Sequence, residues 1–427
     1  MSVSRREFFG AAAAAATVQV SCRGGAAKQT HLSVGPLIGR AVPNAERGLG
    51  QVKITDVKTA SIRLGKYDTE LVKVYTDAGI YGLGETYPQT AGALQNLKFI
   101  KKAVIGKDPL QVEYLFYSML ARGKRSSSRT GAMSGAIAGI ETALWDLAGK
   151  ILKTPVYKLL GGRFHDKLLI YHDTSPPKHR LDPKAWLDVA RESVEYGFKA
   201  IKFDFGQKKN PWNRTFSGNE LSSWIKIVEE TRNYLGPDFN FGIDLKYRNS
   251  LPDAQRLIKA LEPYQLWFIE DPLPPQNVAA LKKIADKANV PIMTGEHFHT
   301  RQTWRELIET QACDYIHPDT QKCGGLLETK WIADWADLYY MPMACHNLCT
   351  PVGTMASAHL CTATRSFFTL ESDSINLPFW KDLIVREHNG KLYENGYLKV
   401  SDKPGLGIEL NEDVCKAHLA KGSSFFK

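Results

Sequence analysis

The sequence predicts an α/β fold, a modified (β/α)8-type barrel with an N-terminal α+β capping domain, and three observations support this prediction. The chain has 427 residues, 43% of them apolar, which is more than one average domain and suits a large domain with a smaller one. After Gly161-Gly162, short apolar runs alternate with helix-length segments, a pattern typical of a parallel sheet. We count eight such runs, which favours a closed barrel, because an open doubly wound sheet usually has about six strands.

The N-terminus resembles a targeting segment. Twin arginines precede an alanine-rich apolar stretch in Ser4-Arg5-Arg6-Glu7-Phe8-Phe9, as in a twin-arginine export signal. We therefore expect residues 1–37 to be an export leader and the mature protein to be periplasmic or otherwise exported. The alternative is a frayed helix on a cytoplasmic protein. Cys22 stands in a weak lipoprotein-like box, but Gln19 replaces the expected leucine, so a lipid anchor is not the expected outcome.

Residues 52–160 predict the α+β capping domain. Two β-runs, 53–64 and 70–76, are followed by the turn sequence Asp77-Ala78-Gly79 and a third run, 80–85, which together predict a small meander. Helical periodicity follows over residues 91–105, 109–121 and 134–152.

Residues 161–374 predict the barrel, and residues 375–427 come after its last strand and are expected to pack back on the capping domain. The eight predicted strands are 168–171, 200–205, 239–244, 266–270, 291–295, 315–318, 339–344 and 367–370.

The composition excludes several classes of protein. The net formal charge is +10, but the basic run Arg122, Lys124, Arg125 and Arg129 has no interleaved aromatic residues, so no nucleic-acid partner is expected. Beyond residue 21 no stretch reaches the roughly 18 uncharged apolar residues of a membrane-spanning helix. The seven cysteines include no CxxC pair, so neither a zinc site nor a disulfide framework is predicted.

Acidic residues end three consecutive predicted strands. Asp244, Glu270 and Glu296 follow one another at an equal spacing of 26 positions, about one β/α unit, which would bring them together above the barrel. Three converging carboxylates repel unless a cation neutralises them, and oxygen-only ligation suits Mg²⁺. The alternative is that each acid caps a helix or lies on the surface.

The same register continues to the last three strands. Asp319, His346 and Glu371 follow the sixth, seventh and eighth predicted strands. A carboxylate beside an imidazole orients it and raises its pKa, which predicts that His346 and Asp319 form an acid/base pair.

On the second predicted strand, alternation places Lys202 and Asp204 on the barrel side. A buried lysine beside a cation site is expected to have a lowered pKa and to hold a substrate oxygen or move a proton. The alternative is a structural ion pair between Lys202 and Asp204.

Together these motifs resemble the enolase superfamily, in the mandelate racemase-like branch of acid-sugar dehydratases and racemases. The resemblance runs from Val52 to about Leu410. Its motifs are Gly82-Leu83-Gly84-Glu85, the helix Ala138-Gly139-Ile140-Glu141-Thr142-Ala143-Leu144-Trp145-Asp146-Leu147, Lys202, Asp244, Glu270-Asp271-Pro272, Gly295-Glu296, Pro318-Asp319, Lys322-Cys323-Gly324-Gly325, His346, Glu371 and Pro404-Gly405-Leu406-Gly407.

The resemblance implies a mechanism. Mg²⁺ held by Asp244, Glu270 and Glu296 would bind the substrate carboxylate while a base removes the α-proton to give an enediolate. His346 would act on one face, Lys202 would lie on the other near the carboxylate, and Glu371 would hydrogen-bond the enediolate oxygen. For a dehydratase, His346 would also protonate the departing β-hydroxyl.

The resemblance also implies a lid and an assembly. A cap loop over residues 64–69, which contains Lys66 and Tyr67, would close over the substrate, and its polar character fits a hydroxylated anion. The family further implies a homo-oligomer.

Two positions depart from the family pattern. Racemising members usually carry a second lysine where this chain has Asp204, which therefore binds a hydroxyl, pairs with Lys202 or serves as a base. Lys246 stands where Asn or His is usual, and it either reaches a distal carboxylate or sugar hydroxyl or points away.

The predicted function is therefore a Mg²⁺-dependent dehydratase (hydro-lyase) of an aldonate-type sugar acid, giving a 2-keto-3-deoxy acid from a small-molecule carboxylate. The alternatives are a racemase or epimerase of a carboxylic acid and a non-catalytic binding protein on the same barrel.

Overall fold

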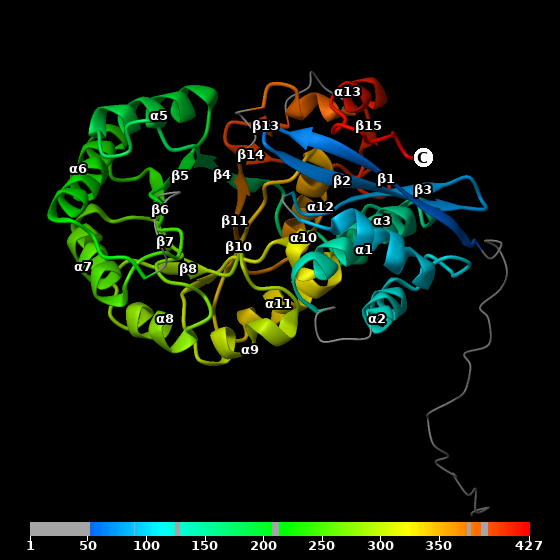
Figure 1. The fold of residues 1–427 in the computed structure, drawn as a ribbon, viewed down its shortest axis with the longest axis horizontal. Coiled ribbons are helices and arrows are strands. Elements are labelled where there is room, and N and C mark those ends of the chain that lie inside the picture. The colour runs from blue at the N-terminus through cyan, green and yellow to red at the C-terminus, as the bar shows by residue number, and fades with distance from the viewer. Residues whose placement is uncertain (1–51, 89, 124–128, 207–212, 374–376, 386–391) are drawn as a thin grey trace, which may run out of the picture. The chain divides into compact units, whose positions relative to one another are not determined.

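The structure of the protein is a computed structural model (Figure 1). It describes residues 52–88, 90–123, 129–206, 213–373, 377–385 and 392–427. The predicted leader, residues 1–37, and Cys22 lie outside these residues. Within the described part of the chain, no helix has the length and apolar character needed to cross a membrane.

The capping domain begins with an antiparallel meander of three strands. β1 (Ile54–Leu64), β2 (Tyr67–Thr76) and β3 (Tyr81–Glu85) pair in chain order. The predicted loop over residues 64–69 is wrong, because Leu64 pairs directly with Tyr67 around a tight turn. Gly65 adopts φ +58° in this turn, and that left-handed conformation lets the two strands reverse within two residues.

Three helices complete the capping domain: α1 (Ala93–Ile100), which continues into the 3-10 turn Lys101–Ala103, α2 (Val112–Arg122) and α3 (Gly131–Ile151). The backbone of α3 lies directly against β3. A Cβ atom on Gly82 would stand 1.9 Å from the carbonyl oxygen of Ala143, and one on Gly84 would stand 2.1 Å from that of Gly139. The two glycines therefore permit the close approach of strand and helix.

The barrel is an eight-stranded closed parallel sheet, as predicted. The strands follow chain order around the barrel, and β11 closes it by pairing with β4. They are β4 (Leu168–Thr174), β5 (Ala200–Asp204), β6 (Asn240–Asp244), β7 (Ile269–Glu270), β8 (Ile292–Thr294), β9 (Tyr315–Ile316), β10 (Met343–Cys345) and β11 (Phe367–Ser372).

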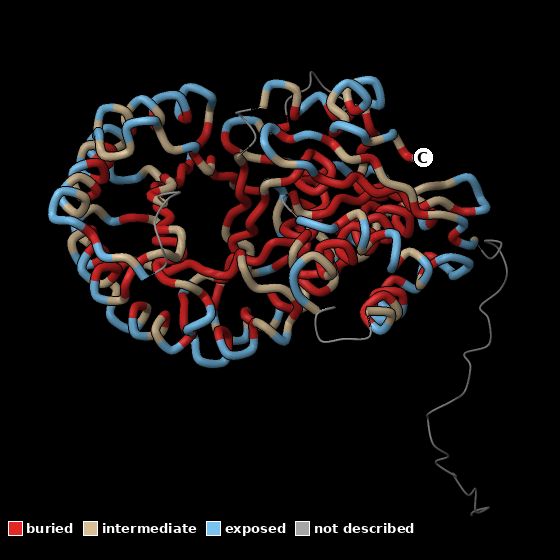
Figure 2. Tube along the Cα trace, in the orientation of Figure 1, coloured by how far each residue is buried: buried red, intermediate tan, exposed pale blue. Residues whose placement is uncertain are grey.

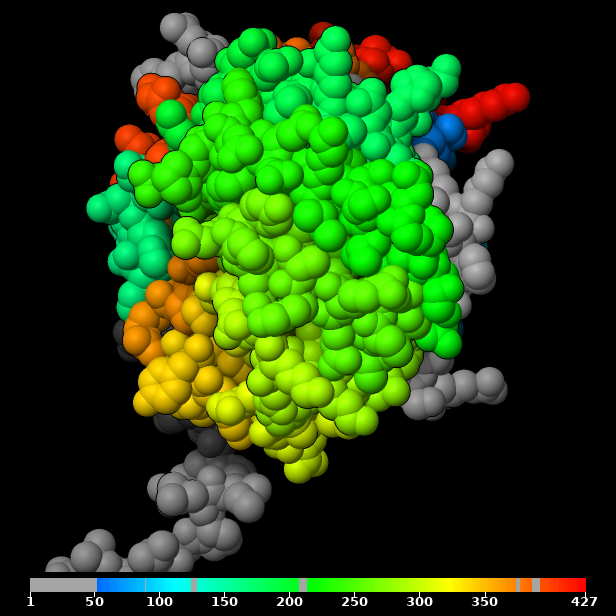
Figure 3. All heavy atoms as spheres, turned by 90° about the vertical axis from the view of Figure 1, so that its left-hand side faces the viewer, coloured from blue at the N-terminus to red at the C-terminus, as the bar shows by residue number. Residues whose placement is uncertain are grey.

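Helices surround this sheet, with buried residues turned towards the strands and exposed residues outward (Figure 2). They are α5 (Pro183–Tyr196), α6 (Gly218–Leu235), α7 (Leu251–Leu261), α8 (Val278–Ala285), α9 (Arg301–Glu309), α11 (Leu326–Asp337) and α12 (Pro351–Thr362), with the short helices α4 (Val156–Leu159) and α10 (Thr320–Cys323). Seen from the side away from the capping domain, the residues coloured green to yellow cover the barrel (Figure 3).

Aromatic side chains fill the layer between strands and helices. Phe203 on β5 packs against Trp186 on α5 with ring centroids 4.5 Å apart, and Phe205 stacks on Trp224 of α6 at 4.2 Å. Phe203 thus points outward, and alternation along β5 turns Lys202 inward.

The C-terminal segment contacts both domains. β13 (Tyr393–Glu394) and β14 (Tyr397–Leu398) form a hairpin whose β14 pairs with β4 of the barrel, while β12 (Ile384–Val385) pairs with β15 (Glu409–Leu410). Beyond α13 (Glu412–Ala417), Arg63 of β1 donates a backbone hydrogen bond to His418, and Ala420 donates one to Ser61, both 2.9 Å long.

Buried carboxylates of the capping domain bind helix N-termini of the barrel. Glu85 at the end of β3 accepts hydrogen bonds from the backbone of Thr350 and Gly353, at the start of α12, both at 2.9 Å. Glu141 on α3 accepts from Leu326 and Leu327, at the start of α11. Each carboxylate satisfies backbone N–H groups that a helix leaves unpaired, which fixes the capping domain on the barrel.

Candidate active site

Three of the predicted site residues come together at the ends of β5, β6 and β7. In the sheet register Asp204 lies beside Asp244, and Asp244 lies beside Glu270. Glu296 follows the next strand, β8. Asp244 and Glu270 are fully buried and Glu296 is 5% exposed, so the three predicted carboxylates follow consecutive strand ends in buried positions.

Cationic side chains neutralise these carboxylates. Lys246 Nζ lies 2.5 Å from Asp244 Oδ2, and Lys202 Nζ donates to Glu270 Oε2 at 2.7 Å. Glu296 Oε2 lies 2.7 Å from His346 Nε2. Burial raises the pKa of Glu296, but neighbouring Lys322, His346 and Lys246 outweigh burial and hold that pKa well below its usual range.

The unpaired oxygens of this set test whether it fits a metal ion. Glu270 Oε1 is buried, and no described residue donates a hydrogen bond of regular geometry to it. Asp244 Oδ2 is buried too and is neutralised by the ammonium of Lys246, its closest cation among the described residues. Buried carboxylate oxygens are suitable ligands for Mg²⁺, so the donor set fits a hard cation.

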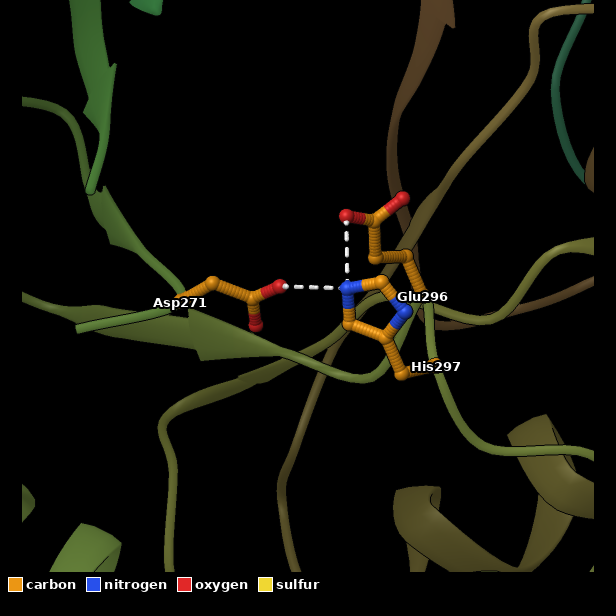
Figure 4. A group of neighbouring side chains, drawn as sticks. All are labelled: Asp271, Glu296 and His297. Carbon is orange, nitrogen blue, oxygen red and sulfur yellow. Dashed lines mark ion pairs between the residues drawn. The ribbon is translucent and has the colours of Figure 1, made fainter. Parts of the chain in front are cut away.

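The described residues also hold a second candidate group, which the sequence analysis did not predict. The ligand atoms of Asp271, Glu296 and His297 all lie within 4.8 Å of one another. Figure 4 shows the His297 imidazole directed at both carboxylates, with Nε2 3.1 Å from Glu296 Oε1 and 3.7 Å from Asp271 Oδ2. Among the described residues, the predicted triad does not meet the same distance limit. In this structure the ammonium of Lys246 lies against Asp244, 2.5 Å from Oδ2. Glu296 is common to both sets.

His346 and Asp319 lie in the predicted arrangement, on adjacent strand ends. His346 Nδ1 is 2.6 Å from Asp319 Oδ2, and the two residues form a parallel β-bridge. Burial lowers the pKa of His346, but the carboxylates of Glu371 and Glu296 and the hydrogen bond with Asp319 raise it to about 10 against the opposing charge of Lys322. His346 is therefore protonated at neutral pH in this arrangement.

Lys202 is completely buried, and its predicted low pKa is wrong. Its ammonium lies 2.6 Å from Glu371 Oε1 and 3.3 Å from Asp173 Oδ1, in addition to its contact with Glu270. Burial lowers its pKa, but these carboxylates outweigh burial and raise it well above the ordinary value. Its ion-pair partners among the described residues do not include Asp204, so the alternative of a Lys202–Asp204 pair is wrong as well.

Glu371 is held beneath the cavity by Lys202 and by the backbone N–H of Asn347, which donates to Oε2 at 3.1 Å. Burial raises its pKa, but Lys202 and His346 outweigh burial and bring the pKa well below its usual range. Glu371 is therefore an anion that accepts hydrogen bonds.

A cavity of about 690 Å³ opens above these residues. Five of the predicted residues line it: Lys66, Tyr67, Asp204, Lys246 and Glu296. The other six are buried and are not among the residues that line it: Lys202, Asp244, Glu270, Asp319, His346 and Glu371. Lys66 and Tyr67 reach the cavity from the hairpin turn between β1 and β2.

Further side chains at the site were not predicted from the sequence. His317 is fully buried, with Nε2 3.4 Å from Glu270 Oε1 and 3.6 Å from Glu371 Oε2. His317 stands two residues before Asp319, and residues two apart in a strand point to the same face. This alternation could have predicted that His317 faces the site. Asp173 and Asp373, at the ends of the neighbouring strands β4 and β11, line the cavity, and burial raises their pKa values to about 6 and about 7.

Comparison with known proteins identifies the family. Residues 50–161 match the mandelate racemase/muconate lactonizing enzyme N-terminal domain, and residues 185–414 match the enolase C-terminal domain-like family. The two matched segments together include most of the chain.

Individual relatives agree with these matches. A D-xylonate dehydratase from Haloferax volcanii is 36% identical over 390 residues, which covers 90% of this chain and 93% of that protein. A D-galactonate dehydratase family member from Musicola paradisiaca is 30% identical over 410 residues, covering 88% and 96%. The crystal structure of a mandelate racemase/muconate lactonizing enzyme-like protein from Rubrobacter xylanophilus superposes with a TM-score of 0.84 at 37% identity, covering 88% of this chain and 100% of that one.

The predicted superfamily and the predicted barrel with its cap are thus both confirmed. The chain belongs to the mandelate racemase/muconate lactonizing enzyme family of the enolase superfamily.

Proposed function

We propose that this protein is a Mg²⁺-dependent dehydratase of an aldonate-type sugar acid, which it converts to a 2-keto-3-deoxy acid. The observation that carries the proposal is the contact of His346, oriented by Asp319, with the carboxylate of Glu296 beneath a polar cavity. Support for the substrate class comes from the relatives whose names are D-xylonate dehydratase and D-galactonate dehydratase family member. Their reaction removes water from a sugar acid, so the enzyme class is hydro-lyase.

Asp244, Glu270 and Glu296 would hold the metal ion. A divalent cation bound there would bind the substrate carboxylate and stabilise the negative charge that develops when the α-proton leaves. Lys246 would have to leave Asp244 Oδ2 before a cation could use that oxygen, because its ammonium lies 2.5 Å from it.

The charge states of the residues suggest their roles. Protonated His346 is the acid that gives its proton to the departing β-hydroxyl, since hydroxide is a poor leaving group. Lys202 and Glu371, held together at 2.6 Å, form a fixed pair of donor and acceptor at the carboxylate end of the substrate.

Asp204 is the candidate base for the α-proton. It lines the cavity, and burial raises its pKa, which strengthens a carboxylate as a base. The ammonium groups of Lys202 and Lys246 have raised pKa values and hold their protons, so neither is a base in this arrangement.

A panel of sugar acids tests the proposal. Purified protein with Mg²⁺ is incubated with aldonates in D₂O, and 2-keto acid and deuterium in the remaining substrate are measured together. Dehydration predicts keto acid from at least one aldonate. Deuterium uptake without keto acid would instead identify a racemase or epimerase, and no turnover of any kind would favour a binding protein.

We also propose that the chain is exported by the twin-arginine route and assembles as a homo-oligomer. The support is the motif Ser4-Arg5-Arg6-Glu7-Phe8-Phe9 and the family resemblance. A reporter fused behind residues 1–37 is expected in the periplasm, and an Arg5→Lys, Arg6→Lys pair should retain it in the cytoplasm.

A further inference from the structure

A continuous chain of polar contacts leads from the acid/base pair to the capping domain. His346 Nε2 lies 2.7 Å from Glu296 Oε2, and the same oxygen accepts a hydrogen bond from Lys322 Nζ at 3.2 Å. The Lys322 ammonium in turn lies 4.1 Å from the centroid of the Tyr87 ring, a cation–π contact. Tyr87 is therefore tied to the acid/base pair through two charged residues.

Tyr87 belongs to the capping domain but lies at the barrel site. It follows β3, two residues after Glu85, whose carboxylate is bound to the start of α12. Its ring centroid is 6.0 Å from that of His346, and both Tyr87 and Lys322 line the 690 Å³ cavity. The domain contact made by Glu85 thus places a cap tyrosine beside the catalytic imidazole.

The hydroxyl of Tyr87 has no acceptor in its charged neighbour. An ammonium group has no lone pair, so the Tyr87 O–H cannot donate to Lys322. Among the residues that the structure describes, none accepts a hydrogen bond from this O–H. The cavity is the remaining direction, and a positive neighbour makes the phenol a better donor.

We propose that Tyr87 is a further catalytic residue, contributed by the capping domain, which donates a hydrogen bond to the departing β-hydroxyl while His346 supplies its proton. The inference rests on the proposed dehydratase function. In the elimination step the C3–O bond breaks, the electron pair of the enediolate forms the C2=C3 double bond, and the leaving oxygen takes the His346 proton to become water. The resulting enol tautomerises to the 2-keto-3-deoxy acid.

The hydrogen bond matters most in the step that breaks C3–O. Negative charge develops on the leaving oxygen in that transition state, and a fixed donor aimed at it is more valuable there than in the ground state. Removal of the α-proton occurs one carbon away and does not need the donor. Loss of the Tyr87 hydroxyl should therefore slow elimination and spare proton exchange.

The test compares wild type with Tyr87→Phe in D₂O, using the aldonate that the wild type dehydrates. We expect keto acid formation by Tyr87→Phe to fall about a hundredfold, the lower end of the range for loss of one such donor, while deuterium exchange at C2 stays within about threefold. The ratio of exchange to elimination then rises at least about thirtyfold. Tyr114→Phe, a 58% exposed cap tyrosine on α2, is the matched control and should keep the wild-type ratio.

Folding and binding are checked separately. Wild type and Tyr87→Phe should have the same melting temperature. They should also have the same inhibition constant for the 3-deoxy analogue of the substrate, which lacks the leaving hydroxyl. Exchange and elimination that fall together, an unchanged rate of elimination, or a Tyr87→Phe protein with weakened binding of the 3-deoxy analogue would each overturn the inference. A wild type that forms keto acid from no aldonate would contradict the proposed function itself.

Discussion

Asp319 Oδ2 lies 2.6 Å from His346 Nδ1, while Asp319 Oδ1 accepts hydrogen bonds from the backbone of Gln321 at 2.7 Å and Lys322 at 3.1 Å. Both oxygens of this carboxylate are therefore fixed, one by the start of α10 and one by the imidazole. The backbone thus determines which nitrogen of His346 faces the substrate.

Asp319→Asn should lower the rate of keto acid formation by about a hundredfold or more. In asparagine one of the two carboxylate oxygens becomes an NH₂ group, which donates and cannot accept. If the amide oxygen keeps the backbone hydrogen bonds, the NH₂ group faces His346 Nδ1, and the imidazole loses the acceptor that orients its protonated form. Steady-state kinetics measure the loss, with the exposed Asp188→Asn on α5 as a control that should retain wild-type activity. Wild-type kcat in Asp319→Asn would show that His346 does not depend on this carboxylate.

Lys246→Met should bind Mg²⁺ more tightly than wild type when no substrate is present. The Lys246 ammonium is 2.5 Å from Asp244 Oδ2 and must leave before a metal can use that oxygen. Calorimetric titration should show a gain of about tenfold or more in affinity, since an ion pair with a buried carboxylate is removed from the competing state. Lys226→Met, whose side chain is 64% exposed, serves as the control. Equal or weaker binding by Lys246→Met would mean that the lysine does not compete for the site.

Gly84→Ala should destabilise the protein by about 3 kcal/mol, as expected for an overpacked contact with backbone on the other side. The added methyl group would stand 2.1 Å from the Gly139 carbonyl oxygen and 2.8 Å from the Ala143 nitrogen, so β3 would be forced away from α3. Gly218→Ala meets no atom within 4 Å and should change the free energy of unfolding by less than about 0.5 kcal/mol. Denaturant unfolding compares the two, and similar stabilities would argue against the tight strand–helix contact.

Glu85→Gln should remove part of the pH dependence of stability. Burial raises the pKa of Glu85 to about 7, although hydrogen bonds from Thr350, Gly353 and Thr69 oppose the shift. The folded state therefore holds a proton that the unfolded state releases, so this group makes the protein less stable as the pH rises from about 4.5 to about 7.

The measurement for Glu85 is denaturant unfolding of wild type and Glu85→Gln at pH 5 and pH 7.5. The free energy of unfolding should fall more steeply with pH in wild type than in the variant. Parallel curves would contradict the assignment of the pH dependence to Glu85.

Much of the barrel was predictable because its signals are local. Each strand is a short apolar run, and the repeat of one β/α unit in the sequence predicts Asp244, Glu270 and Glu296 at successive strand ends. The sequence Gly82-Leu83-Gly84-Glu85 was recognised as a motif. Glycine is required there because the strand contacts the backbone of α3, and this tertiary contact cannot be predicted from the local sequence.

The predictions that were wrong, and the residues that were not predicted, also depend on tertiary contacts. The pKa of Lys202 depends on how many carboxylates surround it, and Asp173 and Glu371, which approach it from β4 and β11, meet only when the barrel closes. Tyr87 belongs to the capping domain, so the β/α repeat of the barrel, which located the other site residues, could not predict it. The turn at Gly65 was mistaken for a longer loop because Tyr67 and Asp68 are polar enough for a loop yet pair as a strand.

Calorimetric titration of Mg²⁺ into wild type, Asp244→Asn and Asp271→Asn decides whether Asp244, Glu270 and Glu296 share one Mg²⁺ ion. We expect one ion per chain in wild type and in Asp271→Asn, and no detectable binding in Asp244→Asn. Binding that survives in Asp244→Asn but disappears in Asp271→Asn would move the ion to the Asp271–Glu296–His297 group. That result, or a folded wild type that takes up no Mg²⁺, would contradict the proposed mechanism.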